Sequence, residues 1–198
     1  MIHHVIVPGV GGSDANHWQS WLQRRLSSSS RVEQNWNAPI LSQWVRRWAS
    51  VVQNIHTPIE IIAHSFGCLT SIAALAQHPE LASKVSKLIL VAPANPARFN
   101  ESGLAQGSEK NFRSYFESLK IQVPSLMIVS ENDPWLAFDD AQHLAKLWNI
   151  PTVNLGQVGH INVASGFGPF PEILTYLNTD YEHSVNARMP RCTHVLSQ

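Results

Sequence analysis

Residues 59–71 read IEIIAHSFGCLTS, an apolar run followed by a tight turn and then a helix-forming segment. Within the turn, Ser65 is flanked by Ala63 two residues before it and by Gly67 two residues after it. This spacing matches the small-x-Ser-x-Gly turn known as a nucleophile elbow, with Ala63 where glycine is more common. Small residues at both positions let strand and helix approach while the serine takes a strained backbone conformation that exposes its hydroxyl. The stretch predicts a strand, a sharp turn and a helix, with Ser65 as a candidate nucleophile.

Short apolar, β-branched runs alternate with longer amphipathic segments along the rest of the chain, a pattern typical of a parallel sheet with crossover helices. The strands are expected at residues 4–7, 31–34, 59–63, 87–91, 125–129 and 152–155. The helices are expected at residues 15–26, 41–55, 66–77, 111–119, 138–148 and 171–177, with Ser13 and Asp14 as caps of the first. The pattern predicts an α/β protein with an open six-stranded parallel sheet and helices on both faces.

The chain length of 198 residues corresponds to one domain. We expect this domain to span residues 1–178 and to be followed by a polar tail of unknown role at 179–198. The longest irregular stretch, residues 93–109, is long enough for a small flap and too short for a lid domain. Open parallel sheets bind ligands beyond the carboxyl ends of their strands, so functional residues are expected in those loops.

Composition excludes several classes of function. Lysine plus arginine and aspartate plus glutamate both total 14, so the net charge is zero and binding to nucleic acid or to an anionic membrane surface is not expected. No secretory signal or membrane-spanning run is recognised. The two cysteines, Cys68 and Cys192, have no metal-ligand spacing and fit reduced thiols. We therefore expect a cytoplasmic protein with no metal and no cofactor, and the sequence identifies no protein partner.

Two further residues follow predicted strands in the order that nucleophilic catalysis requires. Asp133 lies in the loop after the strand at 125–129, and His160 lies in the loop after the strand at 152–155. A serine hydroxyl is a weak nucleophile at neutral pH and needs a base, which a carboxylate in turn holds in one tautomer. The order serine, acid, histidine predicts Asp133 as the acid and His160 as the base.

A glycine-rich loop follows the first predicted strand. Residues 8–12 read PGVGG, and such a loop can present a main-chain N–H to a developing oxyanion. We expect the N–H groups of Val10 and Phe66 to form this oxyanion hole. The same loop does not fit a nucleotide site, because Gly9 and Gly11 lack the third glycine of the dinucleotide fingerprint and no Gly-Lys-Ser/Thr loop is present.

Each of these features has a structural alternative. Ser65 alone could serve as a helix N-cap, Asp133 before a proline is a common turn residue, and His160 is one of ten histidines. Three aromatic residues, Trp135, Phe167 and Phe170, are candidates for a substrate pocket and are at least as typical of a core. Structural roles are the expectation for two further histidines that flank the site loops, His17 and His64.

Four segments together resemble a known family. They are residues 7–12 with the tryptophan-rich helix after them, 63–69, 130–134 and 159–172, and the likeness extends over about residues 2–177. The chain is similar to the YdeN-like compact serine hydrolases that include retinoblastoma-binding protein 9. The resemblance implies an α/β-hydrolase fold without a lid and hydrolysis of small esters or amides without a cofactor, with Ser65, Asp133 and His160 as the triad. A retinoblastoma-binding element is not carried over, because neither cysteine lies in a Leu-x-Cys-x-Glu sequence.

The sequence therefore favours a serine hydrolase that cleaves a small-molecule ester or amide through an acyl-enzyme on Ser65. The alternative is a binding or interaction module that keeps the fold and has lost most of its catalysis, since a fold does not fix a function. Reaction with a fluorophosphonate probe distinguishes the two.

Overall fold

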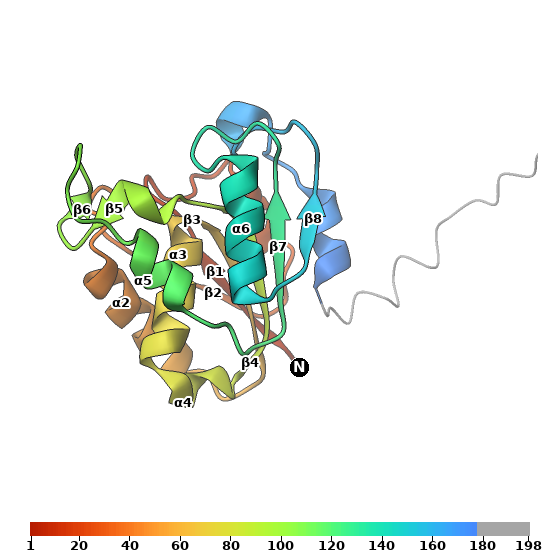
Figure 1. The fold of residues 1–198 in the computed structure, drawn as a ribbon. Coiled ribbons are helices and arrows are strands. Elements are labelled where there is room, and N and C mark those ends of the chain that lie inside the picture. Colours follow the sequence, from red (N-terminus) through yellow and green to blue (C-terminus); the bar gives the residue numbers. More distant parts are fainter. Residues whose placement is uncertain (178–198) are drawn as a thin grey trace, which may run out of the picture.

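A six-stranded, fully parallel sheet forms the centre of the protein in a computed structural model, which describes residues 1–177 (Figure 1). The strand order is β2-β1-β3-β4-β7-β8, and each neighbouring pair is parallel. Their bounds are β1 His3–Val7, β2 Ser29–Arg31, β3 Ile59–Ser65, β4 Val85–Pro93, β7 Ser125–Val129 and β8 Thr152–Asn154. A separate antiparallel pair joins β5 (Phe99–Asn100) to β6 (Gly103–Leu104).

Helices cover both faces of the sheet, as the sequence predicts (Figure 1). The larger core contains residues of α2 (Leu41–Gln53), α3 (Phe66–Gln77), α5 (Arg113–Ser118) and α6 (Phe138–Trp148), whereas the smaller one contains residues of α1 (Trp18–Gln23) and η3 (Pro171–Tyr176). Successive strand residues alternate between these cores: Leu88 and Leu90 belong to the first, and Ile89 and Val91 to the second. The central strands β3 and β4 are mainly apolar because both faces of the sheet are buried.

The strand order reverses between β1 and β3, because the chain runs from β1 outward to β2 and then returns to the other side of β1. In such sheets a crevice opens at the carboxyl ends of the strands on either side of the reversal. Val10 follows β1, and Ser65 ends β3. The topology thus places the glycine-rich loop beside the serine turn.

Several expected elements differ from those observed. The second strand lies at Ser29–Arg31 and not at 31–34, since its serines pair with β1 at the polar edge of the sheet, where His3 hydrogen-bonds the hydroxyls of Ser28 and Ser30. Helix α1 begins three residues later than expected, because residues 14–17 form a turn on the Asp14 carboxylate.

The remaining differences are smaller. The last expected helix is a 3₁₀ helix, η3, and the short helix α4 (Pro79–Ala82) was not expected. Residues 93–109 form the end of β4, a 3₁₀ turn η1 (Pro96–Arg98) and the β5–β6 hairpin. The expected tail at 179–198 lies outside the described residues.

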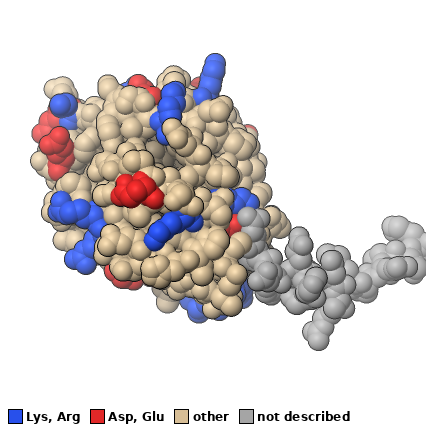
Figure 2. All heavy atoms as spheres, turned by 90° about the horizontal axis from the view of Figure 1, so that it is seen from below, with Lys and Arg blue, Asp and Glu red and all other residues tan. Residues whose placement is uncertain are grey.

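Figure 2 shows the distribution of charged side chains on one face of the protein. On the face shown in Figure 2, lysines and arginines lie in separate groups with acidic side chains between them and wide uncharged areas around them. This distribution agrees with the zero net charge of the sequence. Among residues 1–177, no helix has the length and apolar character needed to span a bilayer.

Candidate active site

Ser65 occupies the sharp turn between β3 and α3. Its φ of 54° and ψ of −123° lie in a region that non-glycine residues rarely adopt. Close packing maintains the turn: a Cβ added to Gly67 would lie 2.3 Å from the Val7 carbonyl oxygen, and one added to Gly9 would lie 2.7 Å from the Ser65 Cβ. Only glycine at these two positions allows β1 and α3 to approach the serine so closely.

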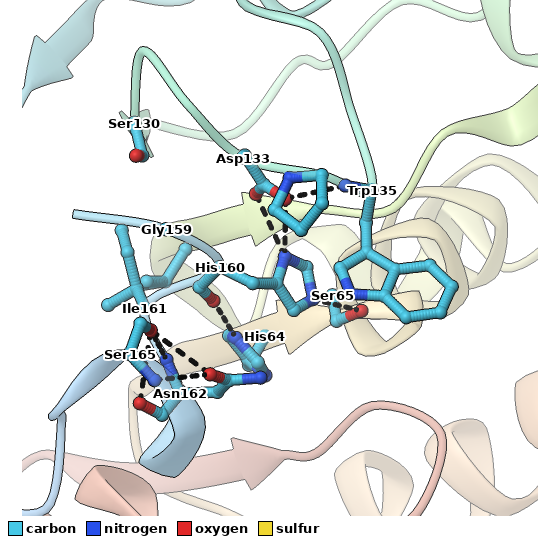
Figure 3. A network of polar contacts seen from close by, with 12 residues as sticks. His64, Ser65, Ser130, Asp133, Trp135, Gly159, His160, Ile161, Asn162 and Ser165 are labelled. Atoms are coloured by element: carbon cyan, nitrogen blue, oxygen red, sulfur yellow. Dashed lines mark hydrogen bonds and ion pairs between the residues drawn. The ribbon is translucent and has the colours of Figure 1, made fainter. Parts of the chain in front are cut away.

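The three residues expected to act together form one hydrogen-bonded chain (Figure 3). Because both Asp133 carboxylate oxygens are acceptors, at 2.9 and 2.8 Å, His160 Nδ1 carries the proton and donates it to them. The other ring nitrogen, Nε2, is then free to accept a hydrogen bond from the Ser65 hydroxyl at 2.9 Å. The Asp133 and His160 side chains are 4% and 8% exposed, so this pair is shielded from water.

Two loops that are distant in sequence are joined around this chain. Asn132 Oδ1 accepts the Gly159 N–H at 2.7 Å, and the Ser130 hydroxyl accepts the Val158 N–H at 3.1 Å. Ser130 also donates to Asn132 Oδ1 at 3.0 Å. The loop that carries the acid is therefore fixed to the loop that carries the histidine by side-chain contacts just before Asp133 and His160 in the chain.

The main chain around His160 is supported from two other elements. His64 Nε2 donates to the His160 carbonyl oxygen at 2.9 Å, and Trp18 Nε1 donates to the Ile161 carbonyl oxygen at 2.8 Å. The Trp18 and His64 rings meet edge to face, with centroids 5.9 Å apart. The structural role expected for His64 is therefore to hold the main chain of His160, the residue that contacts Ser65.

His17 completes a cluster of three imidazoles. Its ring centroid lies 5.0 Å from that of His64, which lies 4.9 Å from that of His160. Burial lowers the pKa of His17 to about 4, against the opposing effect of Asp14. Burial, followed by the neighbouring His160 and His17, lowers the pKa of His64 well below its usual value. Both rings are therefore neutral at pH 7.

The two main-chain N–H groups expected to form an oxyanion hole are those of Phe66 and Val10. Phe66 opens α3, so its N–H is among those at a helix start that have no carbonyl partner within the helix. In the glycine-rich loop, Gly11 donates to Trp36 O at 2.9 Å and Gly12 to Gly9 O at 3.0 Å. Within residues 1–177 the Val10 N–H makes no hydrogen bond, and Val10 lines the same cavity as Ser65.

A cavity of about 330 Å³ opens over the serine. Its lining includes Ser65, His160 and Trp135, and the Trp135 ring centroid lies 6.1 Å from that of His160. The structure therefore brings Trp135 to the site. The other two aromatic candidates, Phe167 and Phe170, are not part of the lining among the described residues and pack against each other with ring centroids 5.1 Å apart.

Metal-ligating clusters and the cysteine near the serine are two further features of the described residues. Among residues 1–177, no group of three His, Cys, Asp or Glu side chains is placed to hold a metal ion. Cys68, three residues after the serine, is fully buried, and burial raises the pKa of its thiol well above the usual value. A thiol in this state is a poor nucleophile, which leaves Ser65 as the candidate.

A profile of the serine hydrolase family matches residues 4–179. The chain belongs to the serine hydrolase family. Among solved structures, this serine hydrolase is similar to a YdeN-like hydrolase from Pectobacterium atrosepticum, with 34% identity over 89% of each chain and a TM-score of 0.76. The ydeN product of Bacillus subtilis is 22% identical over 89% of this chain and 98% of the other, with a TM-score of 0.66.

A more distant likeness concerns the fold alone. An α/β-superfamily hydrolase from Oenococcus oeni is 12% identical over 89% of this chain and 90% of the other, with a TM-score of 0.60. The resemblance to YdeN-like serine hydrolases and the α/β-hydrolase fold are therefore confirmed. A search of curated protein sequences found no match.

Sequence reasoning missed part of the support around this serine hydrolase site. Asn132 lies within a segment that was recognised, yet its contact with Gly159 depends on how two loops fold together. His64 directly precedes Ser65 in the chain, and this position was the only sign in the sequence that His64 could support the site. The contact of Trp18 with Ile161 joins residues 143 positions apart, and no local pattern indicates it.

Proposed function

We propose that the protein hydrolyses small carboxylic esters or amides through an acyl-enzyme formed on Ser65. The observation that carries this proposal is the continuous hydrogen-bonded chain from Asp133 through His160 to the Ser65 hydroxyl, with distances of 2.8 to 2.9 Å. Membership of the serine hydrolase family supports it. A serine that served only as a helix cap would not require a base at hydrogen-bond distance.

The reaction follows from these contacts. His160 Nε2 removes the Ser65 hydroxyl proton as Oγ attacks the substrate carbonyl carbon, and the Val10 and Phe66 N–H groups stabilise the resulting oxyanion. The intermediate collapses when His160 returns the proton to the leaving alcohol or amine. A water molecule then attacks the acyl-enzyme with His160 again as base, which releases the acid and restores Ser65. Asp133 stabilises the imidazolium in both halves.

The direct test is covalent labelling of the purified protein with a fluorophosphonate, combined with hydrolysis of p-nitrophenyl acetate. We expect labelling at Ser65, and Ser65→Ala should lower turnover by at least ~10³-fold. Folded wild-type protein that neither labels nor hydrolyses esters would instead favour a binding module with vestigial catalysis. Wild-type activity in the Ser65→Ala protein would remove the serine from the mechanism.

The role of the acid is tested separately. Asp133→Asn keeps the shape of the side chain and removes the charge that holds His160 Nδ1 protonated, so we expect a loss of about 10⁴-fold with little change in fold. Glu131 is the matched control, since it lies in the same loop and hydrogen-bonds Asn154 at 2.9 Å. Glu131→Gln should retain most of the activity. The reverse result would transfer the role of the acid to Glu131.

A further inference from the structure

One arginine lies at the mouth of the candidate active site. Arg98 ends the 3₁₀ turn η1, directly after β4, and its exposed side chain lines the same cavity as Ser65. β4 is the neighbour of β3 in the sheet, and Ser65 pairs with Pro93 at the end of both strands. The sheet itself thus sets the position of η1 relative to the serine.

A tryptophan holds the Arg98 guanidinium beside the site. Its central carbon lies 4.3 Å from the centroid of the Trp135 ring. The same ring lies 6.1 Å from the His160 ring, and Figure 3 shows Trp135 next to the Ser65–His160 pair. Stacking on an aromatic face fixes the plane of a guanidinium while its N–H edges stay available for a ligand.

The charge of Arg98 is not neutralised within the described residues. No carboxylate of residues 1–177 lies within ion-pair distance of Arg98. The one hydrogen bond of its side chain within these residues is a long contact of 3.5 Å from Nη1 to the Pro134 carbonyl oxygen. A guanidinium carries five N–H donors, so most remain unused. The acidic residue that lines the cavity, Asp14, instead accepts the N–H groups of Asn16 and His17 through Oδ1.

The rest of the cavity mouth is apolar. Four of the five large hydrophobic side chains that are strongly exposed in residues 1–177 line this cavity, with exposed fractions of 42 to 55%. They are Val10, Leu104, Trp135 and Val163. Exposed apolar residues are normally scattered, and their grouping around one opening marks a ligand surface. An ion pair formed there is better protected from solvent than one on an open surface.

We propose that Arg98 recognises a carboxylate on the substrate, so that the preferred substrates are esters or amides with an apolar body and a carboxylate several bonds from the scissile carbonyl. This inference rests on the hydrolase function proposed above and specifies its substrate class. The planar guanidinium on Trp135 matches a carboxylate through two parallel N–H···O bonds.

The test uses pairs of esters that differ only in charge. Monomethyl adipate and its monoamide analogue, methyl adipamate, place the carboxylate or the neutral amide on the acyl side, and hydrolysis is followed by acid release. 4-Acetoxybenzoate and 4-acetoxybenzamide place the same groups on the leaving side, and hydrolysis is followed by phenol absorbance. The readout is the ratio of kcat/KM for the charged ester to that for the neutral one, measured at low ionic strength.

We expect the wild type to prefer the charged member of at least one pair. Arg98→Gln should lower that ratio by about 10- to 100-fold, mainly through KM. Arg98→Lys should lower it less, because lysine keeps the positive charge but lacks the two parallel N–H donors of the guanidinium. Arg25 is a matched control: its guanidinium lies 4.1 Å from the Trp21 ring centroid and outside the cavity lining. Arg25→Gln changes the net charge equally and should leave both the ratio and the basal activity unchanged.

Equilibrium binding tests the proposal even if the enzyme hydrolyses none of these esters. Calorimetric titration of Ser65→Ala should show tighter binding of the charged ester than of the neutral one, and Arg98→Gln in that background should remove the difference. The proposal would be overturned if Arg98→Gln left unchanged both the kcat/KM ratio of charged to neutral ester and the difference in their binding. Because Ser65 labelling and hydrolysis of neutral esters report on the proposed function alone, the two ideas fail in distinguishable ways.

Discussion

His64 hydrogen-bonds the main chain of His160, the residue whose ring contacts Ser65. Its Nε2 donates to the His160 carbonyl oxygen at 2.9 Å, while the His160 ring reaches the hydroxyl of Ser65, the next residue in the chain after His64. Since a carbonyl only accepts, His64 must carry its proton on Nε2. The strand that presents the serine therefore also fixes the loop that presents the base, and a shift of one carries the other with it.

This contact predicts a positioning role for His64. His64→Leu removes the donor, and we expect turnover to slow by about 10- to 100-fold with a smaller change in KM, because a misplaced base slows proton transfer more than it weakens binding. His64→Gln places an amide N–H near the position of Nε2 and should recover much of the loss. Stopped-flow measurement of ester hydrolysis checks both. Equal losses in the two variants would point to packing alone.

The strained backbone of Ser65 predicts that relieving the strain with glycine stabilises the fold, although it removes the nucleophile. A non-glycine residue at φ 54° and ψ −123° costs about 1–3 kcal/mol, which glycine avoids. Glycine also adds about 0.5–1 kcal/mol of unfolded-chain entropy, so Ser65→Gly should be more stable than Ser65→Ala by roughly 1 kcal/mol, although both are inactive. Urea unfolding of the two proteins measures this difference. An Ala variant as stable as the Gly variant would show that the turn is unstrained.

The close approach of β1 and α3 predicts a strong effect of a single methyl group. A Cβ at position 67 would lie 2.3 Å from one main-chain oxygen and 2.6 Å from another, and neither atom can move without displacing β1. We expect Gly67→Ala to cost at least ~2 kcal/mol of folding free energy and to impair activity. Gly107, with φ 57° and open space around it, is the control. Gly107→Ala should cost about 1 kcal/mol through backbone strain alone and spare activity.

The sheet was predictable from the sequence because its strands are buried on both faces. Ile59–Ser65 and Ser125–Val129 are mainly apolar, and both were located to within two residues. Ser29–Arg31 was misplaced because an edge strand needs no apolar run, and its Ser30 hydroxyl instead contacts His3. Helix α6 was placed at its observed bounds, Phe138–Trp148, owing to its clear amphipathic period.

The candidate site was predictable only in part. Ser65, Asp133 and His160 stood out because the fold requires each to follow a particular strand. Contacts between loops, such as that of Asn132 with Gly159, depend on tertiary approach and leave no periodic signal. Arg98 was missed because a charged residue in an irregular stretch resembles any other solvated side chain until its stacking on Trp135 is seen.

His17 links the site to the pH dependence of stability. Its Nδ1 accepts the Gln19 N–H at 3.1 Å and so caps α1, which requires a neutral ring. Burial lowers its pKa to about 4 in the folded protein, whereas the unfolded chain has the ordinary value of 6.5. Above pH 6.5 both states are unprotonated. Between pH 6.5 and 4 the unfolded chain binds a proton that the folded protein excludes, so stability falls as the pH falls, and below pH 4 no further loss arises from this residue.

The resulting prediction compares the wild type with His17→Asn, in which an amide oxygen can replace Nδ1 as the cap and nothing titrates at this position. On acidification from pH 6.5 to 4, the wild type should lose about 3 kcal/mol more unfolding free energy than the variant, from a pKa difference of about 2.5 units at 1.36 kcal/mol each. His3, whose pKa is lowered by burial and by His4, contributes in both proteins and cancels in the comparison. His64 adds to the difference, because His17 is one of the groups that lower its pKa. Urea unfolding across this range measures the two curves. Parallel curves would mean that His17 titrates normally in the folded state and that its ring is not held neutral by burial.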